Sequence, residues 1–471
     1  MLYNSLQFLF VFLPVCLLLY FLVARISGWA ANAVLVAMSF VFYAQWRRAD
    51  LLVIAVSIVV NYSLGAALRW RPSGARHAKL LLSVGVAANL AALGYFKYAN
   101  FLLGTAAEIA GRHFNPLKIA LPLGISFFTF TQIAFLVDAF KGKAKELGFF
   151  RYCLFVAFFP HLIAGPIVHH SELMPQFAFK GAKRWHQKNV DIGIAFLSLG
   201  LFKKVILADS CAPWADQVFN ALHSVSFLDA WRGALAYTMQ LYFDFSGYSD
   251  MAIGLSMMFN VRLPDNFDSP YKSVSIVDFW RRWHMTLSRF LRDYIYIPLG
   301  GNRKGETRRW VNLMVTMLLG GIWHGAGWTF AVWGGYHGLL LMVNHIWFNR
   351  KTPLPAMGAR LATFLAVVVG WVMFRASKIS IAWDRVRSMA GLGRSGIAAL
   401  NGSSQTAWEF TALGFLLLMV NFAPNTKEWV ESRPLNKRRA VLVAILFFVS
   451  VLWIHDAYVG HVPRTFIYFQ F

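Results

Sequence analysis

The sequence predicts an all-α, polytopic membrane protein. Of the 471 residues, 58% are hydrophobic and only 14% are charged, whereas roughly 25% of residues are charged in ordinary soluble domains. Mean hydropathy is +0.52, and apolar runs of about 20 residues, the length that crosses a bilayer as a helix, recur along the whole chain. A soluble core cannot bury this much apolar surface, so we expect residues 1–471 to form one membrane domain.

The apolar runs predict about 11 to 13 membrane-embedded segments. They lie at 6–24, 30–46, 51–68, 79–104, 118–139, 151–168, 189–208, 228–260, 311–334, 335–349, 360–376, 406–423 and 439–455. The segment 151–168 carries Pro160, His161, Gly165 and Pro166 in its middle, which disfavours a regular spanning helix. Because irregular backbone at membrane depth has to line a cavity or be covered by protein, we expect this segment to form a wall of a site.

The charge distribution indicates contact with membrane lipid and argues against nucleic-acid binding. The net charge of +24 comes from 45 Lys and Arg against 21 Asp and Glu. These basic residues lie in short connections between apolar runs, as in cytoplasmic loops under the positive-inside rule. The cysteines Cys16, Cys153 and Cys211 include no CxxC pair, so neither a disulfide framework nor a metal site is predicted.

The stretch 278–293 is too polar for an ordinary spanning helix, because it carries four arginines and two aspartates among its aromatic residues. On a helix the charged side chains share one face, with Asp278–Arg282 and Arg289–Asp293 as i,i+4 pairs. One interpretation is an amphipathic helix at the membrane interface. The other is a helix that lines a polar vestibule inside the bundle, with His284 facing the reacting groups and Arg282 as a candidate substrate-binding residue.

His324 lies in a glycine-rich run, within a segment expected to span the membrane. The adjacent Trp323 is a candidate residue for binding the substrate or donor. An ionisable side chain at that depth is costly unless it is paired or faces a wet cavity. Gly320 and Gly321 share its helical face and would let a helix or substrate approach closely. A neutral imidazole can take a proton from a hydroxyl group that attacks an acyl carbonyl. The alternative is a structural histidine bonded across helices, and His337 is a competing candidate for the base.

Polar residues also interrupt the long apolar run 228–260. Gln240, Asp244 and Tyr248 share one helical face, whereas Asp250 lies on another. Gln240, Asp244 and Tyr248 are candidate residues for binding the substrate or donor. A helix that is polar on two sides should be surrounded by other helices. We expect Asp244 or Asp250 to orient a histidine or to bind an arginine of the stretch 278–293; structural bracing is the alternative for each.

The loop 300–305 is glycine-rich and basic, with Asn302, Arg303 and Lys304 at its centre. Such a loop suits phosphate contact through backbone N–H groups and side-chain charge, or a turn that touches anionic lipid headgroups. It does not match GxxxxGK[ST], which argues against nucleotide hydrolysis. HExxH, GxSxG and the motifs of processive sugar polymerases are also absent from the sequence, so those enzyme classes are disfavoured.

Seven stretches of the chain resemble the membrane-bound O-acyltransferase family, in particular its bacterial exopolysaccharide branch, which includes alginate O-acetylation proteins. They lie at 94–100, 121–126, 159–166, 241–254, 279–284, 299–305 and 317–325. They include Arg-Arg-Trp-His at 281–284 and Trp-His-Gly at 323–325. The motif-bearing core is about 90–350, and the chain beyond about residue 375 resembles the family only in its hydrophobic pattern.

The resemblance implies a funnel-like bundle with a narrow central tunnel in which an acyl donor and an acceptor meet within the membrane. It implies that His324 is the catalytic residue and that His284 is the second polar residue of the site. The implied donor substrate is a thioester, acetyl-CoA or an acyl carrier, with no covalently bound cofactor. In this reading the loop 300–305 would meet the donor's phosphates.

The implied location is the bacterial inner membrane, and the implied acceptor is an extracytoplasmic polysaccharide such as alginate or cellulose. Transfer would be direct or would pass through periplasmic acetyltransferase partners. Two alternatives stay open. In the first, the acceptor is peptidoglycan or teichoic acid. In the second, the chain is a transporter or flippase in which the histidines line a permeation path without covalent chemistry.

Overall fold

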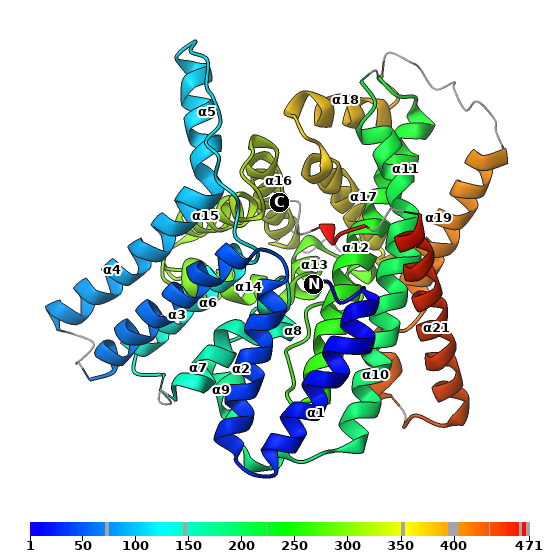
Figure 1. Ribbon diagram of the computed structural model, residues 1–471. Helices are drawn as coiled ribbons and strands as arrows, with labels where there is room; N and C mark the ends of the chain where they lie inside the picture. Colours follow the sequence, from blue (N-terminus) through cyan, green and yellow to red (C-terminus); the bar gives the residue numbers. More distant parts are fainter. Residues whose placement is uncertain are drawn as a thin grey trace.

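The computed structural model describes residues 1–70, 75–144, 148–222, 224–349, 354–393, 404–432, 434–460 and 464–467. Throughout these ranges the regular elements are helices, without a strand, and Figure 1 shows them arranged as one bundle with α12 near its middle. The predicted all-α fold is therefore confirmed.

The helices follow the apolar runs closely. The first half of the chain forms η1 (Phe8–Phe12), α1 (Leu13–Ala24), α2 (Gly28–Ala44), α3 (Arg48–Arg69), α4 (Arg76–Leu93), η2 (Gly94–Tyr98), α5 (Ala99–Ile109), α6 (Ile125–Phe140), α7 (Phe149–Ala157), α8 (Phe159–Leu162), α9 (His170–Ala178), η3 (Lys180–Lys183), α10 (Gln187–Phe202), η4 (Lys203–Ala208) and α11 (Asp209–Phe219). The second half forms α12 (Phe227–Met258), η5 (Pro270–Lys272), α13 (Ile276–Arg282), α14 (Met285–Leu291), η6 (Arg292–Tyr296), α15 (Glu306–His324), α16 (Trp328–Asn349), α17 (Ala356–Arg375), α18 (Ile379–Met389), α19 (Ser404–Phe422), α20 (Thr426–Glu431) and α21 (Lys437–Val459).

The outer helices have the length and composition of membrane spans. In the described part of the chain, four helical units are long and apolar enough to cross a bilayer: α3, the continuous unit Arg76–Ile109, α17 and α21. Large apolar side chains on these helices are exposed, for example Leu52 at 70% and Val84 at 53%. Exposed apolar surface of this extent is the mark of a membrane-contacting face. The chain is thus a multi-pass membrane protein.

Helix α12 is the core of the bundle. Its 32 residues extend over about 48 Å, and most of its side chains are buried. Against α10, a Cβ added at Gly193 or at Gly200 would lie 2.6 Å from the carbonyl oxygen of Gly254 or Gly247, respectively. The two backbones therefore touch, which small residues permit in membrane helices. The expectation that this polar helix is enclosed by others is confirmed.

The chain breaks in two places that matter for the site. The segment 151–168 is interrupted as predicted, because α7 ends at Ala157 and the short α8 gives way to non-helical backbone after Leu162. The expected spanning segment 311–334 is wrong in its boundary. Helix α15 ends at His324, and α16 begins at Trp328 after a glycine-containing turn. His324 therefore occupies the end of a helix and not its middle.

Both described ends of the chain pack on the centre of α12. The ring of Tyr3 lies 4.9 Å from that of Tyr248, and the ring of Phe466 lies 4.5 Å from it on centroids. The Tyr3 hydroxyl donates to the Phe159 carbonyl at 2.6 Å, and the Ile467 backbone N–H donates to Asp244 at 3.0 Å. These contacts brace the helix that carries the polar residues of the run 228–260.

Candidate active site

His284 and His324 lie next to each other inside the bundle. Their ring centroids are 6.2 Å apart, and the two residues are 0% and 5% exposed. They come from different elements, since His284 separates α13 from α14 and His324 ends α15. Two stretches about 40 residues apart in sequence are thus brought together at one buried point.

The backbone at His284 corrects the expected helix over 278–293. Helix α13 starts behind Ser275, whose side chain accepts from the Asp278 N–H, and ends at Arg282. His284 then adopts φ 44° and ψ 52°, in the left-handed region, and α14 follows. A residue other than glycine in this region costs about 1–3 kcal/mol and is found where the surroundings impose it, often at functional sites. The turn points the imidazole into the bundle, which a continuous helix would not do.

Asn266 imposes this turn and orients the imidazole. Its backbone carbonyl accepts the N–H of Met285 at 3.0 Å. Its side-chain Oδ1 lies 3.1 Å from His284 Nδ1 and accepts the Thr286 hydroxyl at 2.8 Å, while its Nδ2 donates to Ser249 at 3.1 Å. Because Oδ1 is an acceptor here, His284 Nδ1 carries the hydrogen, and Nε2 of the neutral ring is an acceptor. The sequence contains no motif that marks Asn266, and we did not predict it.

Aromatic rings hold His324 on several sides. The centroids of Trp323, Trp333 and Phe374 lie 5.0, 5.3 and 5.3 Å from the imidazole centroid. Close packing of α15 on α16 fixes the same region, because a Cβ at Gly321 would collide with the Phe330 carbonyl oxygen. The expected close helix approach beside His324 is confirmed at Gly321.

His337, the competing candidate, lies behind this aromatic wall. It is 0% exposed, and its ring packs 4.9 Å from Trp333 and 5.1 Å from Trp280. It does not line the cavity that His324 lines. The geometry therefore favours His324 as the histidine that can meet a substrate.

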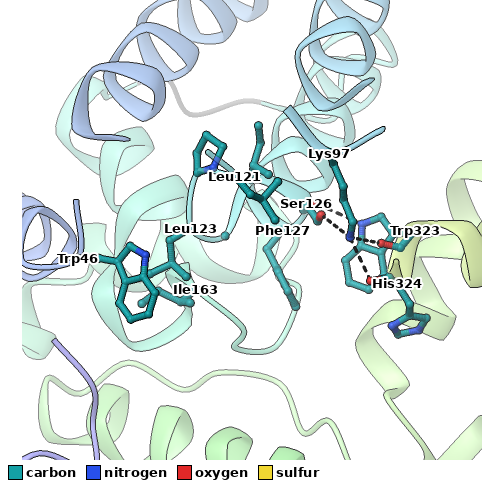
Figure 2. Close-up of a pocket in the computed structure, with 12 residues that line it drawn as sticks. Trp46, Lys97, Leu121, Leu123, Ser126, Phe127, Ile163, Trp323 and His324 are labelled. Carbon is teal, nitrogen blue, oxygen red and sulfur yellow. Dashed lines mark hydrogen bonds between the residues drawn. The ribbon is translucent and has the colours of Figure 1, made fainter. Parts of the chain in front are cut away.

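A cavity of about 130 Å³ opens at His324. Figure 2 shows Trp323 and His324 on one side of it and Trp46, Leu123 and Ile163 on the other. Its lining consists of Trp46, Lys97, Leu121, Pro122, Leu123, Gly124, Ile125, Ser126, Phe127, Ile163, Trp323 and His324. Its volume is below the roughly 300–1,000 Å³ of pockets for drug-sized ligands, so it fits a small acyl group and not a whole nucleotide.

The broken segment 151–168 forms part of this wall, as predicted. Ile163 lines the cavity, and the Ile167 N–H donates to the Thr286 hydroxyl at 3.0 Å. The turn before α6 packs directly on it, because a Cβ at Gly124 would lie 2.9 Å from the Leu162 carbonyl oxygen, and the φ of +71° at Gly124 also favours glycine. Irregular backbone at this depth is thus covered by protein and faces a cavity.

Lys97 is a second residue of the cavity that we did not predict. Its Nζ donates to the carbonyl oxygens of Trp323 at 2.7 Å and His324 at 3.1 Å, and to the Ser126 hydroxyl at 3.2 Å. The sequence did hold a signal, since an ionisable residue inside the apolar run 79–104 meets the same criterion that identified His324.

The predicted partners of Asp244 and Asp250 are wrong. Asp244 pairs with Lys204 at 2.6 Å and Asp250 with Lys203 at 2.7 Å. The lysines come from η4, which directly follows α10. Neither carboxylate binds an arginine of the stretch 278–293 or a histidine in the described contacts, so bracing of α12 is the role that their geometry supports.

Gln240 and Tyr248 share the α12 face of Asp244, whereas Phe245 of the same helix packs on His284 at 4.7 Å. Tyr248 packs against both described ends of the chain. The cavity at His324 is lined by none of Gln240, Asp244 and Tyr248. Their predicted contact with substrate therefore stays a prediction.

Arg282 points toward carboxylates and not toward the cavity. Its Nε lies 3.0 Å from Asp278, as predicted, and its Nη1 lies 3.4 Å from Asp268. The other predicted pair, Arg289 with Asp293, is wrong. Arg289 pairs with Glu172 at 2.6 Å and Asp293 pairs with Arg292 at 2.7 Å, because η6 replaces the expected regular helix over this part.

Asn302, Arg303 and Lys304 are exposed in a turn with φ of 113° at Gly300 and 56° at Gly301. The 19 residues of α15 separate this turn from His324 by about 28 Å. Phosphates bound there would be far from the imidazole, so only a donor with a long flexible arm could use both sites. Donor binding by the loop stays a prediction.

Comparison with known proteins finds similar sequences over most of the chain. The model of the membrane-bound O-acyltransferase family matches residues 136–381. The chain is 43% identical to the peptidoglycan O-acetyltransferase of Helicobacter pylori, over 87% of this chain and 83% of that protein. It is 43% identical to the probable alginate O-acetylase AlgI of Pseudomonas aeruginosa, over 90% and 81%. It is 39% identical to that of Pseudomonas putida, over 100% of both chains.

Proposed function

The chain belongs to the membrane-bound O-acyltransferase family, and we propose that it transfers an acetyl group from a cytoplasmic thioester to a hydroxyl of an extracytoplasmic polysaccharide, with His324 as the base. The observation that carries this proposal is the buried pair of His324 and His284, with His324 at the wall of a small cavity. A cavity of about 130 Å³ favours acetyl over a long acyl chain.

The chemistry requires one base close to the reacting atoms. The imidazole of His324 takes the proton of the acceptor hydroxyl while its oxygen attacks the thioester carbonyl carbon. The carbon–sulfur bond then breaks, the ester bond remains, and the proton passes to the departing thiolate. His284, oriented through Asn266, is the second polar group beside the reacting atoms. Acetyl-CoA, or an acetylated carrier, is the donor substrate.

The arrangement of basic residues supports the direction of transfer. Arg25 at the end of α1 lies beside Lys183 and Arg184, at the start of α2, whereas Trp46 of the cavity follows the other end of α2. Under the positive-inside rule the basic cluster is cytoplasmic. The cavity then opens toward the outer side, from which a polysaccharide hydroxyl would arrive.

The names of the relatives support a polysaccharide acceptor, because one is a peptidoglycan O-acetyltransferase and others are probable alginate O-acetylases. We propose an exopolysaccharide such as alginate or cellulose, reached directly or through an extracytoplasmic acetyltransferase partner, with the chain in the bacterial inner membrane. Peptidoglycan is the second candidate, because the Helicobacter pylori protein is as similar to this chain as the alginate proteins are.

A transfer assay tests this function. The purified protein is incubated with labelled acetyl-CoA and with fragments of alginate, cellulose, peptidoglycan and teichoic acid. We expect label on a polysaccharide fragment with wild-type protein, loss of transfer in His324→Ala, and activity in His337→Gln, the matched variant of the buried histidine behind Trp333. Intact thioester with the wild-type protein would contradict direct transfer to these acceptors. Loss of transfer in His337→Gln but not in His324→Ala would indicate that His337 is the base.

A further inference from the structure

The π-helical turn η2 holds the end of the helix that carries His324. The Tyr98 hydroxyl donates to the Ile322 carbonyl at 2.8 Å, and Lys97 donates to the next two carbonyls, those of Trp323 and His324, at 2.7 and 3.1 Å. Three consecutive carbonyl groups are therefore bound by two neighbouring side chains. These groups belong to the last turn of α15, where carbonyls have no partner within the helix.

The ammonium group of Lys97 has three N–H donors, and each has an acceptor. Two are the carbonyls of Trp323 and His324, and the third is the Ser126 hydroxyl at 3.2 Å. Figure 2 shows these three bonds converging on Nζ. A carboxylate or phosphate of a substrate would have to displace one of them, so the geometry indicates that Lys97 acts on the protein and not on a ligand.

Two further contacts join this arrangement to the cavity wall. The Trp323 indole N–H donates to the Ser126 carbonyl at 3.3 Å, so Ser126 is linked both to Lys97 and to the residue before His324. The positive charge at the C-terminal end of α15 also interacts favourably with the helix dipole. An ionisable residue inside the candidate span Arg76–Ile109 is costly and is retained where it serves a function.

We propose that Lys97 is a positioning residue for acetyl transfer, which together with Tyr98 fixes the last carbonyls of α15 and thereby holds the His324 imidazole beside His284 at the cavity. This inference rests on the proposed function, because the position of His324 affects the rate only if His324 is the base. It assigns a role to the stretch 94–100, for which the sequence alone suggested none.

Lys97→Met removes the three hydrogen bonds and keeps a long apolar side chain. Because a displacement of about 1 Å at a reacting group can lower the rate about 100-fold, we expect kcat to fall by about 100-fold while the KM for acetyl-CoA stays near the wild-type value. Lys97→Arg keeps a cationic donor and should restore part of kcat. Tyr98→Phe removes one of the carbonyl bonds and should lower kcat less than Lys97→Met does.

Lys183→Met is the matched control. Lys183 is also partly buried and donates to Tyr20 at 3.4 Å and to Asn32, in contacts that do not involve α15. We expect its kcat to equal that of the wild type. An unchanged kcat in Lys97→Met, or a rise in KM with unchanged kcat, would overturn the positioning role, the latter result indicating a donor-binding lysine.

A second measurement needs no acetyl transfer and so separates this inference from the proposed function. Modification of His324 by diethyl pyrocarbonate is followed by mass spectrometry in membranes of each variant. We expect the rate of modification to rise in Lys97→Met, to return toward the wild-type rate in Lys97→Arg, and to be unchanged in Lys183→Met. Equal rates in wild type and Lys97→Met would show that Lys97 does not hold the end of α15, whatever reaction the enzyme catalyses.

Discussion

Replacement of Asn266 by alanine is a sharp test of how the site is built. The change removes the four side-chain hydrogen bonds of Asn266, which join it to His284 Nδ1, to the hydroxyl and backbone N–H of Thr286, and to Ser249. Side-chain hydrogen bonds inside membrane proteins contribute about 0.6 kcal/mol each on average, so we expect a loss of about 2 kcal/mol in the free energy of unfolding. The protein should remain folded, since a loss of this size is common for single substitutions.

The effect of Asn266→Ala on catalysis should exceed its effect on stability. Without an acceptor at Nδ1, the His284 ring is no longer restricted to one tautomer and one orientation. Removal of groups that orient metal-bound histidines lowers activity about 10- to 100-fold, and we expect kcat for acetyl transfer to fall by a similar factor. The assay is the initial rate with labelled acetyl-CoA, with thermal unfolding measured on the same samples.

Two variants separate orientation from packing. Asn266→Asp keeps an oxygen acceptor for His284 and should retain more activity than Asn266→Ala. Ser249→Ala breaks only the outer bond of Asn266, so we expect a small loss of stability and a kcat near that of the wild type. A wild-type kcat in Asn266→Ala would refute the reasoning, because His284 would then need no orienting partner.

Three other predictions concern residues outside the contacts of Asn266. Gly321→Val should prevent stable folding, because its side chain would collide with α16 backbone; size-exclusion chromatography of the purified variant measures this, and a monodisperse peak would contradict it. Lys204→Met leaves Asp244 buried without its partner at 2.6 Å and should lower the free energy of unfolding by about 3–5 kcal/mol. Adding Asp244→Asn to this variant should restore part of that loss. Thermal unfolding of the single and double variants measures both effects, and equal stability of wild type and Lys204→Met would contradict the prediction. Replacement of Arg303 and Lys304 by alanine should raise the KM for acetyl-CoA several-fold with little change in kcat if the loop binds phosphate, whereas an unchanged KM would exclude that role.

The bundle could be predicted from sequence because apolar runs set helix positions directly. Each expected segment contains a helix, and the interruption of 151–168 was visible from Pro160 and Pro166. Because the bilayer core holds no water, the backbone N–H and C=O groups of such apolar runs have to bond to each other, which a helix achieves within one segment. The same local reasoning predicted His324 as an embedded ionisable residue.

The details of the site depended on contacts between distant residues. The turn at His284 is imposed by Asn266, 18 positions away, and no periodicity of 278–293 could reveal it. Asp244 has two partners that are distant in sequence. Lys204 lies 40 positions away and Ile467 lies 223 positions away. Gly320 and Gly321, just before His324, were interpreted as sites of close approach, which Gly321 confirms. We did not predict that α15 ends at His324, with Gly325 and Gly327 directly after it.

Proteoliposomes that carry the protein in one orientation give the most direct test of the central claim. Labelled acetyl-CoA is supplied on the side of the basic cluster around Arg25, and the polysaccharide fragment that is acetylated in solution is enclosed on the other side. We predict free CoA outside, acetyl ester inside, and loss of both products in His324→Ala. Equal ester formation in His324→Ala, or passage of intact acetyl-CoA through the wild-type protein, would contradict the account.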